Sequence, residues 1–175
     1  GQPEIIPFGV GAGPVLLHGH AFSERWYVVT EMPARLSLLP ALFGTKTIYD
    51  SFQWPAGQTP TVVLVARDGT SRSVRVATPG TVAIIFHCLN AYDDGDQLVL
   101  DCVSYERALP FSAIAPAARR EALGFRTKTE TSMPKLMRYV IDPARAKVVE
   151  SRELGTVPTE ALDMDRRYRG KRHRY

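Results

Sequence analysis

The 175-residue sequence predicts an all-β fold built from antiparallel hairpins. Short runs rich in β-branched and aromatic residues recur along the chain, and such side chains favour extended backbone. Turn sequences that contain Gly or Pro separate these runs. Apolar residues make up 45% of the chain and charged residues 23%, which is the composition of a globular protein with a core. This pattern is typical of a propeller, a barrel or a sandwich, and no sequence repeat distinguishes the three.

Most of the predicted strands pair into hairpins in chain order. They span residues 26–30, 61–65, 73–76, 82–89, 97–103, 136–141 and 147–151. The three hairpin turns are Arg67-Asp68-Gly69-Thr70, Asp93-Asp94-Gly95-Asp96 and the stretch that begins at Asp142-Pro143. One short surface helix is predicted over residues 114–123, where Gly124 ends it.

No apolar run approaches the roughly 20 residues that a membrane-spanning helix needs. The N-terminus, GQPEIIPFG, lacks the basic and apolar regions of a signal peptide, so we expect a cytoplasmic location. Cys88 and Cys102 lie on the two strands of one predicted hairpin, where a disulfide is one interpretation. Two buried free thiols in a reducing compartment are the favoured interpretation.

The net charge of +4 comes from the last ten residues, RRYRGKRHRY. Without their six Lys and Arg, sixteen basic residues face eighteen acidic ones, a net charge of −2. Such a tail could contact phosphates or an anionic membrane surface. It could also be a polar turn or strand, and Tyr168 and Tyr175 favour a strand. Nucleic-acid binding would rest on this charge alone, so we expect none.

Two of the four histidines, His18 and His87, end the apolar runs PVLLH and VAIIFH. A core histidine with one hydrogen bond is the simpler interpretation, and metal ligation through neutral imidazole is the alternative. In the stretch His18-Gly19-His20, two imidazoles would share one strand face. No nucleophile motif, phosphate-binding loop or H-E-x-x-H motif is present.

Two segments resemble those of a known family. Residues 86–101, FHCLNAYDDGDQLVLD, resemble the F-H-x-x-N-A-Y-E-x-G-D-x-[VI]-V-x-D segment of the carotenoid oxygenase family. Residues 18–33, HGHAFSERWYVVTEMP, resemble its other histidine segment, and the order and spacing of the two agree. The stretches LMRYVID, ELGTVPTE and DRRYRGKRHRY extend the resemblance over nearly the whole chain.

The resemblance implies a seven-bladed β-propeller in which four histidines on inner strands hold one non-haem Fe(II). His18 and His87 would be two of these ligands, and the carboxylate of Glu160 would orient His87. His20 stands where the family has an aromatic residue, and it is the alternative to His18. The other two ligands would lie before residue 1 and beyond Tyr175. We therefore expect residues 1–175 to be a partial propeller, an internal fragment that is inactive alone.

The resemblance also implies an activity. The complete protein would be an Fe(II)-dependent oxygenase that uses dioxygen to split a conjugated C=C bond into two carbonyl products. Its substrate would be a hydrophobic polyene, such as a carotenoid or apocarotenoid, or else a stilbenoid. Peripheral contact with a membrane is a further expectation. The alternative is a non-catalytic propeller fragment or degenerate paralogue that acts as a binding module.

Overall fold

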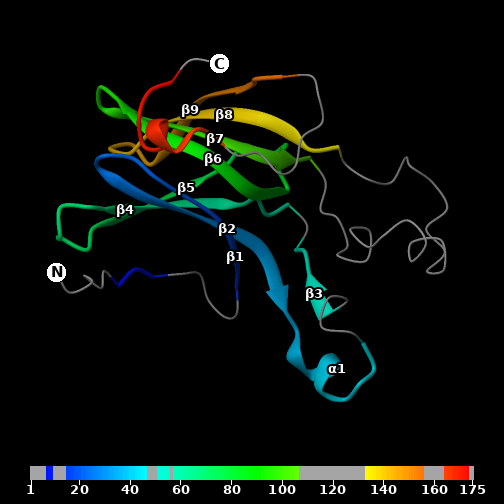
Figure 1. Ribbon diagram of the computed structural model, residues 1–175. Coiled ribbons are helices and arrows are strands. Elements are labelled where there is room, and N and C mark those ends of the chain that lie inside the picture. The colour runs from blue at the N-terminus through cyan, green and yellow to red at the C-terminus, as the bar shows by residue number, and fades with distance from the viewer. Residues whose placement is uncertain are drawn as a thin grey trace.

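Two antiparallel sheets make up the fold in this computed structural model, which describes residues 7–9, 15–46, 51–55, 57–106, 133–155 and 164–173 (Figure 1). The first sheet has the strand order β1-β2-β4-β5, with β3 paired to β2, and the second has the order β6-β7-β8-β9. The bounds are β1 Val15–Phe22, β2 Trp26–Leu36, α1 Leu38–Leu42, β3 Phe52–Gln53, β4 Thr61–Ala66, β5 Ser73–Ala77, β6 Ile84–Asp94, β7 Gln97–Tyr105, β8 Lys135–Asp142 and β9 Lys147–Glu153.

The structure confirms the predicted hairpins β4–β5, β6–β7 and β8–β9. It extends the expected strand at His18-Gly19-His20 to the whole of β1, and it adds β3 and the short helix α1 at positions where no element was predicted. The helix predicted over 114–123 lies outside the described residues. None of the helices in the described part of the chain is long and apolar enough to cross a lipid bilayer.

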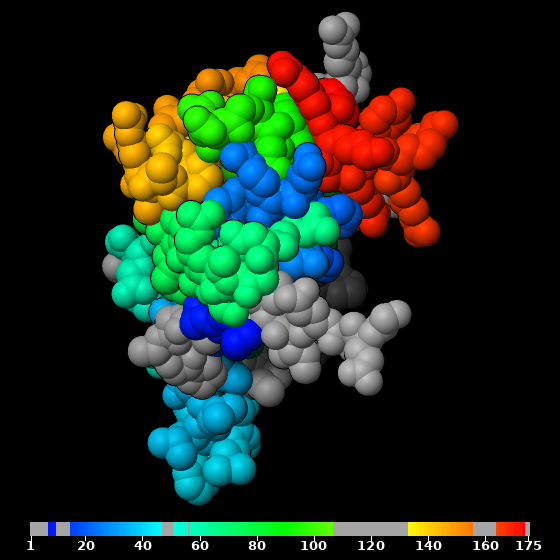
Figure 2. All heavy atoms as spheres, turned by 90° about the vertical axis from the view of Figure 1, so that its left-hand side faces the viewer, coloured from blue at the N-terminus to red at the C-terminus, as the bar shows by residue number. Residues whose placement is uncertain are grey.

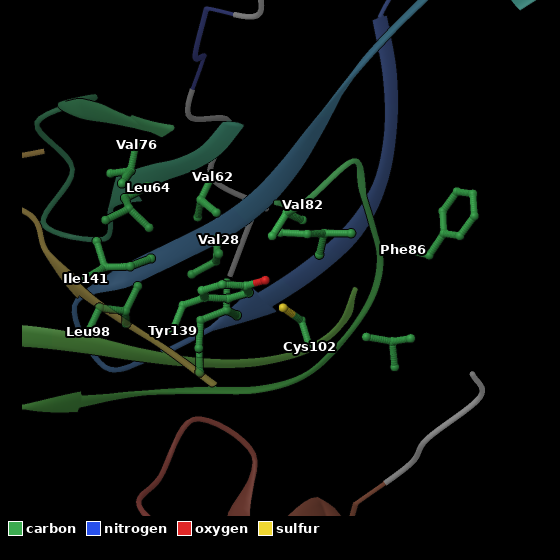
Figure 3. Packing of buried hydrophobic residues seen from close by; sticks show 14 of the residues in the cluster. Val28, Val62, Leu64, Val76, Val82, Phe86, Leu98, Cys102, Tyr139 and Ile141 are labelled. Atoms are coloured by element: carbon green, nitrogen blue, oxygen red, sulfur yellow. The ribbon is translucent and has the colours of Figure 1, made fainter. Parts of the chain in front are cut away.

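A hydrophobic core lies between the two sheets (Figure 3). The first sheet contributes Val28, Val62, Leu64 and Val76, and the second contributes Leu98, Cys102, Tyr139 and Ile141. Tyr139 is fully buried, and its hydroxyl lies 3.0 Å from the hydroxyl of Ser104. Strands β1 and β6 lie close together at one side of this core, and β5 and β9 at the other, so the sheets are stacked in the same sense.

Gly19 permits the close approach of β1 to β6. A Cβ atom at this position would lie 2.5 Å from Thr30 Oγ1, 2.8 Å from the Phe86 carbonyl oxygen and 2.9 Å from Cys88 Sγ. The Gly19 amide donates to Thr30 Oγ1 at 3.0 Å, and the same hydroxyl lies 3.2 Å from the Ile85 carbonyl oxygen. One threonine hydroxyl therefore connects both sheets where a side chain on Gly19 would separate them.

The second sheet contains a buried ion pair between Asp101 on β7 and Arg138 on β8. The two residues are cross-strand partners, and the guanidinium holds both carboxylate oxygens at 2.7 and 2.8 Å. Asp101 is fully buried. Removing one partner of such a pair leaves an uncompensated buried charge, which typically destabilises a protein strongly.

Cys88 and Cys102 face each other across the β6–β7 hairpin, and both are free thiols. Cys102 is fully buried, whereas Cys88 is half-buried and packs against the core. The two thiols are free as predicted, but only Cys102 is fully buried, and the reducing compartment stays a prediction.

Replacing Gly19 with Ala should lower the free energy of unfolding by about 2 kcal/mol, because the new methyl group must displace backbone as well as side-chain atoms. Urea unfolding measures the effect. Gly80→Ala is the matched control, since nothing lies within 4 Å of that position; it should change stability by less than about 0.5 kcal/mol. Equal effects of the two variants would contradict the tight contact at Gly19.

Burial raises the pKa of the Cys102 thiol well above its usual range, and the neighbouring Cys88 thiol adds to this effect. In the unfolded chain the thiol loses its proton near pH 8.5. Its contribution to stability is therefore complete below that pH and is lost as the pH rises, by about 1.4 kcal/mol per pH unit. Urea unfolding between pH 8 and pH 10 measures this slope. In Cys102→Ala, the free energy of unfolding should fall less steeply with pH by that amount. An unchanged slope would contradict a raised pKa of the Cys102 thiol.

Candidate metal centre

The structure brings His18 and His87 together from different sheets. His18 lies on β1 and His87 on β6, and their ring centroids are 5.1 Å apart with the ring planes at 85°. Both rings line a cavity of about 340 Å³. His18 and His87 are 69 residues apart in the sequence, and the packing of β1 against β6 brings them together.

Both histidines lie in β-bulges. In β1, His18 and Gly19 together oppose the single residue Thr30, because Leu17 pairs with Glu31 and His20 with Val29. In β6, the ladder shifts between Ile85 and Cys88, so that Phe86 and His87 together oppose one residue of β7. A bulge interrupts the alternation of side chains and re-aims one of them, which is common beside functional sites.

A backbone carbonyl fixes the tautomer of His18. Its Nδ1 lies 3.0 Å from the Phe86 carbonyl oxygen, which can only accept a hydrogen bond. Nδ1 therefore carries the proton, and Nε2 keeps its lone pair. The Phe86 ring packs against the same imidazole with centroids 4.9 Å apart. A ring held through one nitrogen, with the other nitrogen free to donate electrons, is the usual arrangement of a metal-binding histidine.

His87 is half-buried, and within the described ranges neither ring nitrogen has a hydrogen-bond partner. Glu160, the residue predicted to orient it, lies outside the described residues, so that role stays a prediction. His20 lines the same cavity as His18, and both residues are exposed; within the described ranges His20 differs in making no ring contact with His87.

The two imidazoles fit a shared metal ion. A metal–nitrogen bond of about 2.1 Å places an imidazole centroid roughly 3 Å from the ion, so rings 5.1 Å apart can reach one ion between them. Among the residues that the structure describes, no group of three or more His, Cys, Asp or Glu side chains is arranged to hold a metal. His18 and His87 therefore remain candidate donors, and a metal ion between them would need further ligands beyond these two.

Cys88, adjacent to His87, carries a protonated thiol as long as no metal ion is bound. Burial raises the pKa of its thiol to about 12, so the sulfur is protonated at neutral pH. A thiol must lose its proton to ligate a metal. The candidate donors that line the cavity are imidazole nitrogens, which suit Fe(II), Co(II) or Zn(II).

Residues 164–173, here called the C-terminal segment, pack on β6 and supply Arg169 and Gly170 to the cavity wall. The segment forms a short 3₁₀ helix at Arg166–Tyr168 and then turns, so the expected turn is confirmed and the expected strand is wrong. Some of its cationic side chains have acidic partners: Arg167 pairs with Asp165, and Arg172 lies 3.4 Å from Asp94. Local carboxylates therefore neutralise part of the charge that dominates the tail.

Reasoning from the sequence missed Asn90, whose side chain holds this segment in place. It is buried and lies on β6, three residues after His87. Its signal was present in the stretch FHCLNAY, where a polar residue interrupts a buried strand. A buried amide requires hydrogen-bond partners, and this one finds them about 80 residues away in the sequence.

Comparisons with known proteins place these observations in a family. The sequence model described as "Retinal pigment epithelial membrane protein" matches residues 2–175. The apocarotenoid-15,15'-oxygenase of Synechocystis is 26% identical over 137 residues, which are 78% of this chain and 26% of that protein. The chloroplastic carotenoid cleavage dioxygenase 8 homolog A of rice, Oryza sativa subsp. japonica, is 30% identical over 98 residues, 54% of this chain and 17% of that one.

The fold is also that of solved structures. The cobalt-substituted apocarotenoid oxygenase of Synechocystis superposes with a TM-score of 0.77 at 22% identity, over 91% of this chain and 31% of that chain. The chain thus spans about a quarter to a third of the length of the Synechocystis oxygenase. Because the family match covers residues 2–175, the chain belongs to the retinal pigment epithelial membrane protein family, the family of carotenoid oxygenases.

Proposed function

We propose that the chain is part of a non-haem Fe(II)-dependent oxygenase that cleaves a conjugated C=C bond of a carotenoid or apocarotenoid. The observation that carries this proposal is the pair of imidazoles, His18 and His87, held 5.1 Å apart on one cavity. Membership of the carotenoid oxygenase family supports it, since that family typically uses iron.

The two sheets would be two successive blades of a seven-bladed propeller, with residues 1–175 as one partial propeller domain. Each sheet has four main strands in chain order, and β1 and β6 are equivalent edge strands that lie side by side. In a propeller such strands line the central axis. Both candidate ligands lie on them, which agrees with one metal near that axis.

His18 and His87 would supply two of four imidazole ligands, and Glu160 would hold His87 in position. The Phe86 carbonyl keeps the proton of His18 on Nδ1, so Nε2 would be the nitrogen available to a metal ion. When bound, Fe(II) would supply the one-electron chemistry that triplet dioxygen needs to react. The reaction adds both oxygen atoms of O2 to the two alkene carbons and breaks the bond between them, giving two carbonyl products.

A polyene is favoured over a stilbenoid as the substrate. The named relatives are apocarotenoid and carotenoid oxygenases. The described cavity, of about 340 Å³, is at the small end of ligand pockets, which span roughly 300–1,000 Å³. A long substrate would therefore extend beyond it, with only its reacting bond beside the histidines.

The second candidate function is a non-catalytic binding module. It is motivated by the absence of a three-ligand group among the described residues. Metal content separates the two candidates: a catalytic protein carries iron, whereas a degenerate paralogue does not.

In the complete protein, His87→Ala and His18→Ala should each remove most of the bound iron. Polyene cleavage should fall by at least about 100-fold, because even a residue behind a ligand contributes 10- to 100-fold. Elemental analysis and product chromatography measure the two effects. His20→Ala should retain its iron. Full iron content in His87→Ala would contradict the proposed ligand set. Loss of iron in His20→Ala but not in His18→Ala would show that His20, and not His18, is the ligand.

We further propose that α1 contacts a lipid surface. This helix projects from the body of the protein (Figure 2), and four large apolar side chains on it and just after it are exposed. They are Leu38, Leu39, Leu42 and Phe43, with exposed fractions of 55, 64, 76 and 74%. Transfer of one such side chain from water to an apolar phase is worth about 1.5–3 kcal/mol, and a projecting cluster can enter a bilayer without rearrangement of the sheets.

The double substitution Leu42→Asp with Phe43→Asp should reduce sedimentation with phosphatidylcholine vesicles by at least about tenfold, since two apolar anchors are replaced by charges. Val149→Asp on β9 is the matched control, because Val149 is also exposed but lies in the second sheet. Equal vesicle binding by all three proteins would contradict a role for α1.

A further inference from the structure

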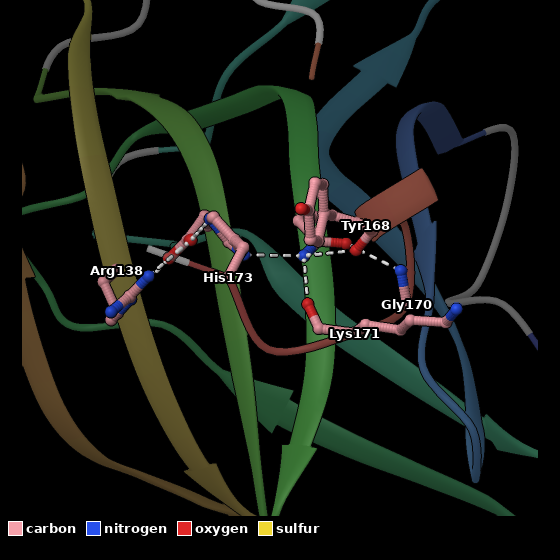
Figure 4. A network of polar contacts seen from close by, with 7 residues as sticks. Arg138, Tyr168, Gly170, Lys171 and His173 are labelled. Atoms are coloured by element: carbon pink, nitrogen blue, oxygen red, sulfur yellow. Dashed lines mark hydrogen bonds and ion pairs between the residues drawn. The ribbon is translucent and has the colours of Figure 1, made fainter. Parts of the chain in front are cut away.

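Asn90 joins β6 to the C-terminal segment through both ends of its amide. Figure 4 labels its partners in the segment, Tyr168, Gly170, Lys171 and His173. Its side chain is buried, with an exposed fraction of 2%. Oδ1 accepts from the Gly170 amide at 2.8 Å. Nδ2 lies 3.0 Å from the Lys171 carbonyl oxygen, 3.0 Å from His173 Nδ1 and 3.4 Å from the Tyr168 carbonyl oxygen.

These contacts fix the amide orientation and the tautomer of His173. The Gly170 N–H can only donate and the Lys171 carbonyl can only accept, so Oδ1 and Nδ2 cannot exchange places. Nδ2 therefore donates to His173, whose Nδ1 must keep its lone pair. The remaining proton of this neutral imidazole is on Nε2, which lies 3.4 Å from Asp101 Oδ2.

The second sheet holds this arrangement from three strands. Asn90 is on β6, Asp101 on β7 and Arg138 on β8, and the buried Asp101–Arg138 pair keeps the carboxylate beside His173. Tyr92 packs against the same imidazole, with ring centroids 5.8 Å apart. The outer part of the segment is tied more weakly, because the Arg172–Asp94 pair is exposed to solvent.

The segment forms one wall of the histidine cavity. Arg169 and Gly170 line the cavity together with His18 and His87, and Asn90 also borders it. The backbone N–H of Gly170 donates a hydrogen bond to Oδ1 of Asn90. Any loss of that contact releases the wall at the point where it reaches the cavity.

We propose that Asn90 is a positioning residue that closes the histidine cavity by clamping residues 164–173 against β6, with neutral His173 as its fourth partner. The clamp stands on the contacts described above, and only its connection to catalysis rests on the proposed function. Its effect on chemistry would be indirect, through access to His87 and the placement of Arg169.

Asn90→Asp is the sharpest test, because it keeps an acceptor for Gly170 but removes the donor that serves Lys171 and His173. Trypsin should cut the segment at Arg166, Arg167 and Arg169 at least about tenfold faster, since a docked backbone must open before cleavage. Diethyl pyrocarbonate should modify His87 faster by a similar factor below the melting temperature. The matched control is Asp94→Asn, which weakens only the exposed ion pair and should stay within about twofold of the wild type.

If Asn90→Asp does not fold, His173→Phe provides the same test, because it keeps the ring packing on Tyr92 but lacks the acceptor. His173→Gln restores an acceptor and should recover the protection. Wild-type rates of cleavage and of His87 modification in the folded variants would overturn the clamp. A lower melting temperature with unchanged His87 modification would also overturn it, since stability alone would then explain the residue. Absence of iron in the wild-type protein would sink the proposed function instead and leave these rates to decide the clamp.

Discussion

The close contact between β1 and β6 is the constraint on which the rest of the structure depends. Gly19 has no side chain, and the Thr30 hydroxyl occupies the space next to it, within hydrogen-bond distance of both sheets. Because the two backbones approach so closely, the Phe86 carbonyl reaches the His18 ring. The same contact sets the separation of the two imidazoles. A methyl group at Gly19 would thus alter the fold and the candidate metal centre together.

The polar groups of the second sheet form a layer outside the core. Asp101 and Arg138 neutralise each other on neighbouring strands, and Asn90 and His173 continue the layer toward the cavity. Each buried polar atom of this layer costs free energy unless a partner satisfies it. The C-terminal segment supplies several of those partners, so the sheet and the segment stabilise each other.

Most strands were predictable from the sequence because they are runs of apolar and β-branched residues, and turns that contain Gly or Asp separate these runs. Strand β1 was harder, since the stretch HGHAF has little strand propensity and contains a bulge. Helix α1 contains Pro40 and lacks a side-chain cap at Ser37, so no local signal marks it. The meeting of His18 with His87, and of Asn90 with Gly170, depends on long-range packing that no local pattern encodes. The apolar runs marked each histidine separately, and only the family resemblance paired the two.

The bulged position of His18 has a consequence for the order of events during maturation. His18 and the carbonyl that holds it are 68 residues apart in sequence, and they meet only after both hairpin systems have docked. Closing so large a loop is slow compared with forming a hairpin. An ion that needs both imidazoles would therefore be captured late, by an already assembled protein. Its binding free energy would then oppose the separation of the two sheets. The affinity for the metal would therefore add directly to the stability of the contact between β1 and β6.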